Sequence, residues 1–137
     1  MTYAINATSK ANQDALITIK DTQIKFGTTP QSNNTLASPA DLFLSAFAAC
    51  ILKNVQRFSV LMKFEYAYAD ITVNAIRLEK PPRMDHIDYQ LTVYTNDQNL
   101  NSTLLKKNIE KFGTIYNTVK LSCTINGTVQ SEKIKTV

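Results

Sequence analysis

The chain has 137 residues, of which 44% are hydrophobic and 19% are charged, and its formal net charge is +4. This length predicts a single domain over residues 1–137, and the scattered lysines and arginines form no basic stripe that would indicate nucleic-acid binding. The longest apolar run, residues 42–52, is too short to span a bilayer, and residues 1–10 lack the pattern of a secretory signal. We therefore expect a cytoplasmic protein that binds neither nucleic acid nor membrane.

The first third of the chain predicts short β-strands followed by a loop. Three strands are expected, at Tyr3–Thr8, Ala15–Lys20 and Gln23–Phe26, with polar turns between them. Residues 27–37 are rich in Gly, Pro, Ser, Asn and Thr, which indicates a loop.

A long helix is predicted next, from Ser38 to about Met62. Ser38 can cap it, Pro39 suits the first helical position, and Asp41 can complete a capping box. Residues 42–52 are apolar nearly all round the helix, so we expect this part to be buried.

The second half predicts strands and one further helix. Two strands with alternating apolar residues, Tyr66–Leu78 and Asp85–Thr95, are separated by Pro81-Pro82. A helix follows at residues 102–112, then a loop or helix end at 113–120, a strand at Leu121–Val129, and a polar tail at 131–137 that is expected to fray. Because the strands cluster apart from the helices, the fold class is expected to be α+β.

The chain lacks the usual residues of metal and nucleotide sites. His86 is its one histidine, and it has no zinc-ligand spacing to the two cysteines. Its three glycines form no phosphate-binding motif. We expect no metal and no cofactor.

Cys50, inside the apolar part of the long helix, has two possible roles. With 100° of rotation per residue, Phe43 and Phe47 before Cys50 and Asn54 and Arg57 after it lie on nearly the same helical face as Cys50. Lys53 lies one step round the helix from that face. Cys50 is therefore either a reactive thiol in a small pocket with aromatic walls and a nearby cation, or a core residue beside cations that face water. The residues alone leave both open.

Two further residues have simpler predictions. Asp41 lies nine residues before Cys50 and so faces the opposite side of a straight helix, which favours a capping role. Cys123 shares the apolar face of a predicted strand with Leu121 and Ile125, so we expect an inert core thiol.

Two segments resemble the OsmC/Ohr family. SPADLFLSAFAACILKNV, residues 38–55, resembles the family's central helix, and FGTIYNTVKLSCTINGTV, residues 112–129, resembles its Cys-Pro-Val-x-Asn-Thr segment and closing strand. The resemblance implies an OsmC-like α+β fold, with antiparallel strands, a long central helix and an intertwined homodimer. It also implies an oxidative-stress function, in which one cysteine attacks an organic hydroperoxide, a second resolves the product, and an arginine and a glutamate activate the first.

The resemblance carries over only in part. Cys50 matches the peroxide-attacking cysteine, but Gly113 stands where the second cysteine belongs. Ala40 stands at the glutamate position, with Asp41 matching an acidic residue found one place later in some branches, and the chain has no arginine before Arg57. The resemblance thus implies a degraded site with one candidate peroxidatic thiol.

Two functions remain in competition. The first is a one-cysteine thiol peroxidase acting on organic hydroperoxides and recycled by an outside thiol, with Cys50, Arg57 and Asp41 as candidate catalytic residues. The second is a non-catalytic dimer that holds a small apolar molecule, with a wall formed by Phe43, Phe47, Lys53, Asn54 and Tyr116.

Overall fold

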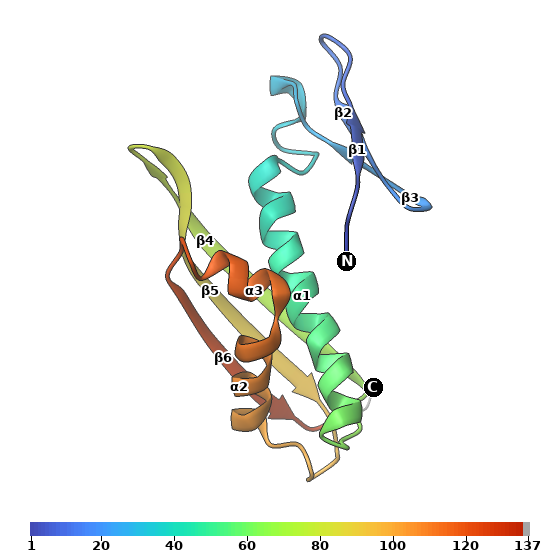
Figure 1. Ribbon diagram of the computed structural model, residues 1–137, viewed down its shortest axis with the longest axis vertical. Helices are drawn as coiled ribbons and strands as arrows, with labels where there is room; N and C mark the ends of the chain where they lie inside the picture. The colour runs from blue at the N-terminus through green and yellow to red at the C-terminus, as the bar shows by residue number, and fades with distance from the viewer. Residues whose placement is uncertain (136–137) are drawn as a thin grey trace. The chain divides into compact units, whose positions relative to one another are not determined.

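The computed structural model describes residues 1–135, and the chain forms two compact units, Met1–Phe43 and Leu44–Val137 (Figure 1). The long helix α1 (Pro39–Leu61) begins in the first unit and continues through the second. The end of the predicted tail, residues 136–137, lies outside the described residues.

The first unit contains an antiparallel sheet of three short strands, β1 (Asn6–Thr8), β2 (Ala15–Ile19) and β3 (Thr22–Phe26). All three predicted strands are present, and the first is shorter than expected. The predicted loop follows and includes one 3₁₀ turn, η1 (Pro30–Ser32).

Asp14 organises this loop through one carboxylate oxygen. Its Oδ1 accepts hydrogen bonds from the backbone N–H groups of Thr28 (3.0 Å) and Thr29 (3.1 Å) and from the hydroxyls of Thr29 (2.9 Å) and Ser32 (2.8 Å). These donors, the Ser32 hydroxyl first among them, lower the pKa of Asp14 to about 2, because they favour the charged carboxylate.

The predicted capping box begins α1. The backbone N–H of Asp41 donates to Ser38 Oγ (3.2 Å), and the backbone N–H of Ser38 donates to Asp41 Oδ2 (2.9 Å). The two side chains thus satisfy donors that the helix itself leaves unpaired, and Pro39 lacks one such donor. The start of the helix is therefore set by three neighbouring residues.

The second unit contains a sheet in the order β4 (Tyr68–Glu79), β5 (Pro82–Tyr94), β6 (Ile125–Glu132). β4 and β5 are antiparallel, as a tight hairpin requires. β6 pairs parallel to β5, so the expectation of antiparallel strands is wrong at this pair. The cause is the helical connection between them, since a chain that crosses over through helices can return in the same direction.

That connection consists of α2 (Ser102–Phe112) and α3 (Thr114–Val119). Asn101 caps α2 by accepting a hydrogen bond from the Leu104 backbone N–H (3.0 Å). Residues 113–120, predicted as a loop or helix end, are mostly the separate helix α3, which starts after one extended residue, Gly113 (φ −71°, ψ 116°). Gly113 thereby separates the two helices.

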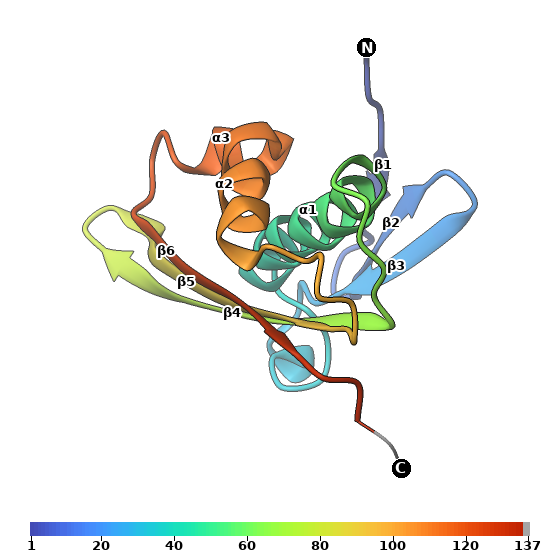
Figure 2. The same cartoon turned by 90° about the horizontal axis from the view of Figure 1, so that it is seen from below.

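The core of the second unit lies between one face of the sheet and the helices, which all lie on that face (Figure 2). The predicted alternation in β5 is confirmed, because its inward side chains are fully buried: Ile87, Tyr89, Leu91 and Val93. Their partners include Phe47, Ile51, Val55 and Phe58 of α1 and Leu105 and Ile109 of α2. Each large side chain buried in this way contributes about 2 kcal/mol.

Gly127 of β6 lies directly opposite Tyr89 in the parallel pair. A Cβ at position 127 would overlap the Tyr89 ring. The glycine therefore makes room for an aromatic ring that would otherwise not fit in this layer of the core.

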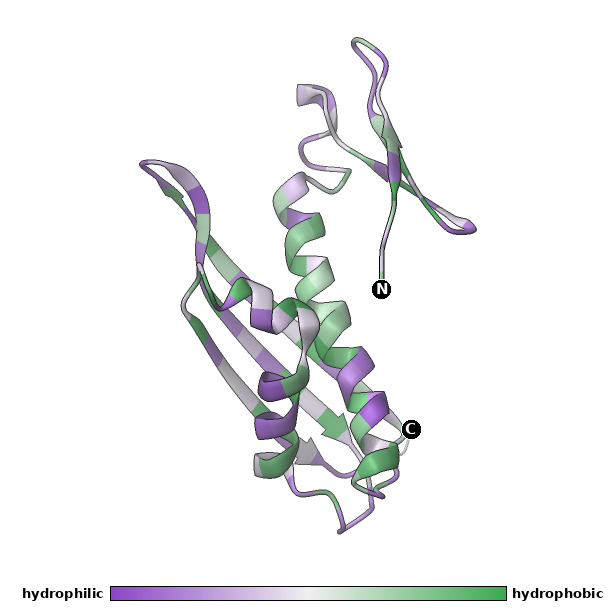
Figure 3. Cartoon of the chain, viewed as in Figure 1, coloured by the Kyte–Doolittle hydropathy of each residue, from purple (hydrophilic) through white to green (hydrophobic). Residues whose placement is uncertain are grey.

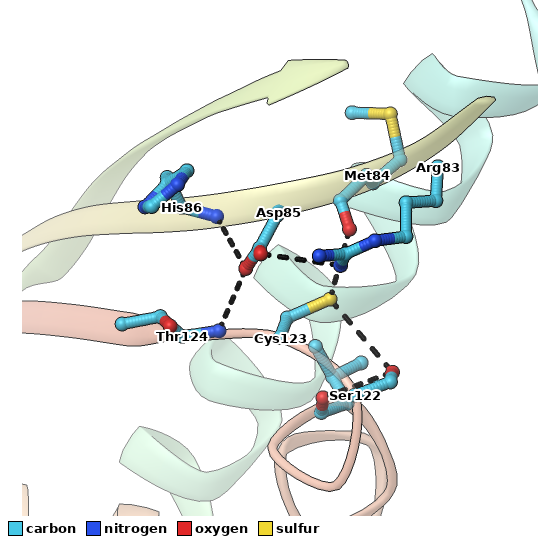
Figure 4. A network of polar contacts seen from close by, with 8 residues as sticks. Arg83, Met84, Asp85, His86, Ser122, Cys123 and Thr124 are labelled. Carbon is cyan, nitrogen blue, oxygen red and sulfur yellow. Dashed lines mark hydrogen bonds and ion pairs between the residues drawn. The ribbon is translucent and has the colours of Figure 1, made fainter. Parts of the chain in front are cut away.

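Asp85 of β5 links its strand to Thr124, the residue just before β6 (Figure 4). Its Oδ1 accepts from the backbone N–H groups of Thr124 and His86 (both 2.8 Å), and its Oδ2 forms an ion pair with Arg83 (3.1 Å). These contacts lower the pKa of Asp85, and the hydrogen bond from the Thr124 backbone has the largest effect. His86 has a positive φ of 51° beside the irregularity in the β4–β5 register, so Asp85 also supports a strained backbone position.

Cys123 lies in the same network, in a bend before β6, and not in the strand that was predicted. The chain turns there because the backbone N–H groups of Ser122 and Cys123 both bond the Val119 carbonyl (3.0 Å each). Leu121 is 83% exposed and does not join the expected apolar face, which Ile125 and Val129 of β6 do form against the core. Cys123 is half-buried, packs at the edge of the core, and donates its S–H to the Met84 carbonyl (3.3 Å).

Within residues 1–135, no helix combines the length and the apolar character that crossing a membrane requires.

Candidate functional site

Cys50 lies in the second unit, on α1, where its side chain is half-buried. Along the helix, its sulfur contacts Asn54, whose Nδ2 lies 3.7 Å from Sγ. Across the fold it faces Gly113, since a Cβ at Gly113 would lie 3.3 Å from Sγ. The thiol is therefore held between α1 and the short junction that separates α2 from α3.

Asn54 is buried one turn after Cys50. Its amide nitrogen donates to the Cys50 carbonyl oxygen (2.8 Å) and also lies within hydrogen-bonding distance of the Cys50 sulfur (3.7 Å). The prediction that Asn54 shares the face of Cys50 is confirmed, because positions four apart on a helix are neighbours.

Gly113 is distant from Cys50 in sequence, and only the packing of α2 and α3 against α1 brings the two together. Its backbone N–H bonds the Ile109 carbonyl (2.9 Å), which places its Cα next to the thiol. Having no side chain, Gly113 presents backbone to the sulfur, at the position where the resemblance implies a second cysteine. Both cysteines are free thiols.

The two cations that follow Cys50 lie on the exposed side of the helix. The Arg57 guanidinium lies over two aromatic rings, those of Phe58 (5.3 Å to the centroid) and Phe112 (5.8 Å). Among residues 1–135, no hydrogen bond joins Lys53 or Arg57 to the Cys50 sulfur. The predicted cation near the thiol is therefore not in hydrogen-bond contact with it. The Arg57 guanidinium packs on aromatic rings instead.

Asp41 lies in the first unit and serves the helix start. Its Oδ2 also accepts a hydrogen bond from the Ser38 hydroxyl (3.0 Å). The Ser38 backbone N–H, followed by this hydroxyl, lowers the pKa of Asp41. The capping role predicted for Asp41 is therefore confirmed.

The aromatic residues expected to line a pocket differ in their environments. Phe47 is fully buried, with its ring near those of Tyr89 (6.0 Å) and Tyr116 (5.9 Å). Phe43 belongs to the first unit and is partly exposed. Phe47 and Tyr116 thus form part of the core of the second unit.

A buried polar group that the sequence did not indicate lies in this aromatic cluster. The Tyr89 hydroxyl is buried and, within residues 1–135, has no hydrogen-bond partner; burial raises the pKa of Tyr89. Burial also raises the pKa of Tyr116 to about 12, assisted by the Glu110 carboxylate. Glu110 itself pairs with Lys106 one turn earlier (3.0 Å). No spacing rule links these residues, because they come from β5, α2 and α3.

No metal site is apparent in the part of the chain that the structure describes: nowhere in residues 1–135 do three or more His, Cys, Asp or Glu side chains gather as ligands.

Comparison with known proteins gives a consistent family and fold. The family model described as "OsmC-like protein" matches residues 32–133. An OsmC like protein from Mycoplasma pneumoniae is similar in structure, with a TM-score of 0.79 at 19% identity over 96% of this chain and 97% of the other. A hypothetical protein from Aquifex aeolicus has a TM-score of 0.80 at 14% identity, over 98% and 99% of the two chains.

An organic hydroperoxide resistance protein OsmC from Legionella pneumophila has a TM-score of 0.72 at 14% identity, over 95% of this chain and 98% of the other. At such identities the likeness concerns the fold, which is α+β with a long helix, as predicted. No curated protein matches the chain in sequence.

Proposed function

Because the chain belongs to the OsmC-like protein family, we propose that it reduces organic hydroperoxides, with Cys50 as its one peroxide-attacking thiol. The observation that carries this proposal is the position of the Cys50 sulfur. It is half-buried, it contacts an amide donor on one side, and it faces the bare backbone of Gly113 on the other.

The proposed reaction has two stages. The Cys50 thiolate attacks the outer oxygen of the hydroperoxide; a sulfur–oxygen bond forms, the oxygen–oxygen bond breaks, and the alcohol leaves after taking up a proton. The cysteine is then a sulfenic acid. An external thiol attacks its sulfur and releases water, and a second equivalent reduces the mixed disulfide and restores the free thiol.

The external thiol is required by the residues around the sulfur. Gly113 offers no sulfur of its own, and Cys123 donates its S–H to the Met84 carbonyl in a bend next to β6. A compartment that supplies reducing thiols, such as the cytoplasm, suits this cycle. Lys53 and Arg57 have no assigned part in it, because neither contacts the sulfur directly.

We also propose that the protein acts as a homodimer. α1 is apolar along much of its length (Figure 3), and in the second unit it leaves large side chains exposed: Leu52 (36%), Val60 (68%) and Leu61 (60%). A helix that is apolar on faces beyond the one packed on its own core favours burial against a partner. Size-exclusion chromatography with light scattering tests this, and a monomeric mass at micromolar concentration would contradict it.

The activity is tested by following cumene hydroperoxide in the presence of dithiothreitol. Wild type is expected to consume the peroxide, Cys50→Ser is expected to lose that activity, and Cys123→Ser serves as the matched thiol control with activity retained. Equal rates for wild type and Cys50→Ser would end the proposal.

A further inference from the structure

Asn54 is an unusual residue for its position. It is 8% exposed, and its neighbours on the inner face of α1 are the core residues Ile51, Val55 and Phe58. Burying an amide costs free energy unless its hydrogens find acceptors. The free-energy cost of burying Asn54 therefore depends on which acceptors its amide finds.

The amide nitrogen has two hydrogens and two acceptors, and both acceptors belong to Cys50. One is the Cys50 carbonyl oxygen at 2.8 Å, a common local contact for a polar side chain in a helix. The other is Sγ at 3.7 Å, within the range for a hydrogen bond to sulfur. The amide nitrogen has two hydrogens to donate, and the sulfur is the second acceptor within its reach.

A donor aimed at a sulfur favours its charged form, because a thiolate is a stronger acceptor than a thiol. Among residues 1–135, Asn54 is the only group that donates a hydrogen bond to the Cys50 sulfur. Of the cations near this part of α1, Arg57 lies over the rings of Phe58 and Phe112, and Lys111 lies over that of Phe112.

From this geometry we propose that Asn54 stabilises the thiolate of Cys50. The inference rests on the proposed peroxidase function for its significance, but its physical content concerns only the thiol. It assigns the amide a chemical role, distinct from lining a pocket.

The test measures the alkylation of Cys50 by iodoacetamide against pH, with Cys123→Ser as the parent so that one thiol reports. In Asn54→Leu, the midpoint of the pH profile is expected to rise by about one unit, equivalent to about tenfold slower alkylation below the midpoint. In Asn54→Asp, a carboxylate beside the sulfur is expected to raise the midpoint at least as far. Ser59→Ala is the matched control, because Ser59 is also buried on α1 but bonds the Gln56 carbonyl (2.7 Å).

The possible outcomes separate the two proposals. Unchanged midpoints in both Asn54 variants would overturn the role of Asn54, even if wild type reduces hydroperoxide and Cys50→Ser does not. If the midpoints rise but the wild type consumes no peroxide, the role proposed for Asn54 is supported and the proposed peroxidase function is rejected. A variant that merely loosened the helix would expose the thiol and speed alkylation, which is opposite to the expected effect and would also count against Asn54.

Discussion

Replacing Gly113 by Cys tests the central geometric feature of the site, the contact between this residue and Cys50. A Cβ at 113 would lie 3.3 Å from the Cys50 sulfur, and in a disulfide the distance from one Cβ to the far sulfur is about 3 Å. The backbone of Gly113 is already in a region open to any residue (φ −71°, ψ 116°). We therefore expect the cysteine introduced by Gly113→Cys to form a disulfide with Cys50 on mild oxidation.

The expected stabilisation follows from the loop that the bond would close. A loop of about 64 residues gives about 4 kcal/mol at 25 °C in the chain-entropy model. The new Cβ would also lie 2.9 Å from the Ile109 carbonyl oxygen and 3.1 Å from Tyr116 Cβ. Relieving these contacts is expected to cost about 1–2 kcal/mol. The oxidised variant should thus exceed the wild type in stability by about 2–3 kcal/mol.

The assay combines thiol counting with thermal unfolding of the variant, oxidised and reduced. Both forms carry the steric cost and differ by the full loop term of about 4 kcal/mol, so the midpoint of the oxidised form is expected to exceed that of the reduced form by roughly 14 °C. Gly113→Ala reports the steric cost alone, and Gly113→Cys with Cys50→Ser cannot form the bond. If the variant keeps all its thiols after oxidation, or pairs residue 113 with Cys123, the placement of Gly113 against Cys50 is refuted.

Two other predictions concern buried and charged groups. Tyr89→Phe removes a buried hydroxyl that has no partner within residues 1–135, so urea unfolding should show a gain of about 1 kcal/mol, and a loss would mean that the hydroxyl is bonded. Asp14 has its pKa lowered to about 2, so its contribution to stability is present above pH 4 and is lost as the pH falls towards 2. Between about pH 5 and pH 2.5, the free energy of unfolding should therefore fall less in Asp14→Asn than in the wild type. An identical pH dependence in the two proteins would contradict this.

Much of the local structure was predictable from the sequence. Ser38, Pro39 and Asp41 set the start of α1 because a capping box involves only residues within one turn. The alternation of Ile87, Tyr89, Leu91 and Val93 predicted the inner face of β5, because side chains of a strand point to alternate sides. The contact of Asn54 with Cys50 follows from the same kind of local rule, applied to a helix.

The features that decide the chemistry required the tertiary structure. Gly113 lies against the Cys50 sulfur only because α2 and α3 fold back onto α1, and Arg57 turns to Phe112 because that ring is brought from another helix. The parallel direction of β6 likewise depends on the path of this crossover. Helical and strand periodicities describe neighbours within about one turn or one pleat, whereas the packing of distant segments depends on the whole core. The sequence by itself therefore identified the thiol, its helix and the neighbouring Asn54, and only the fold decided which distant groups face the sulfur.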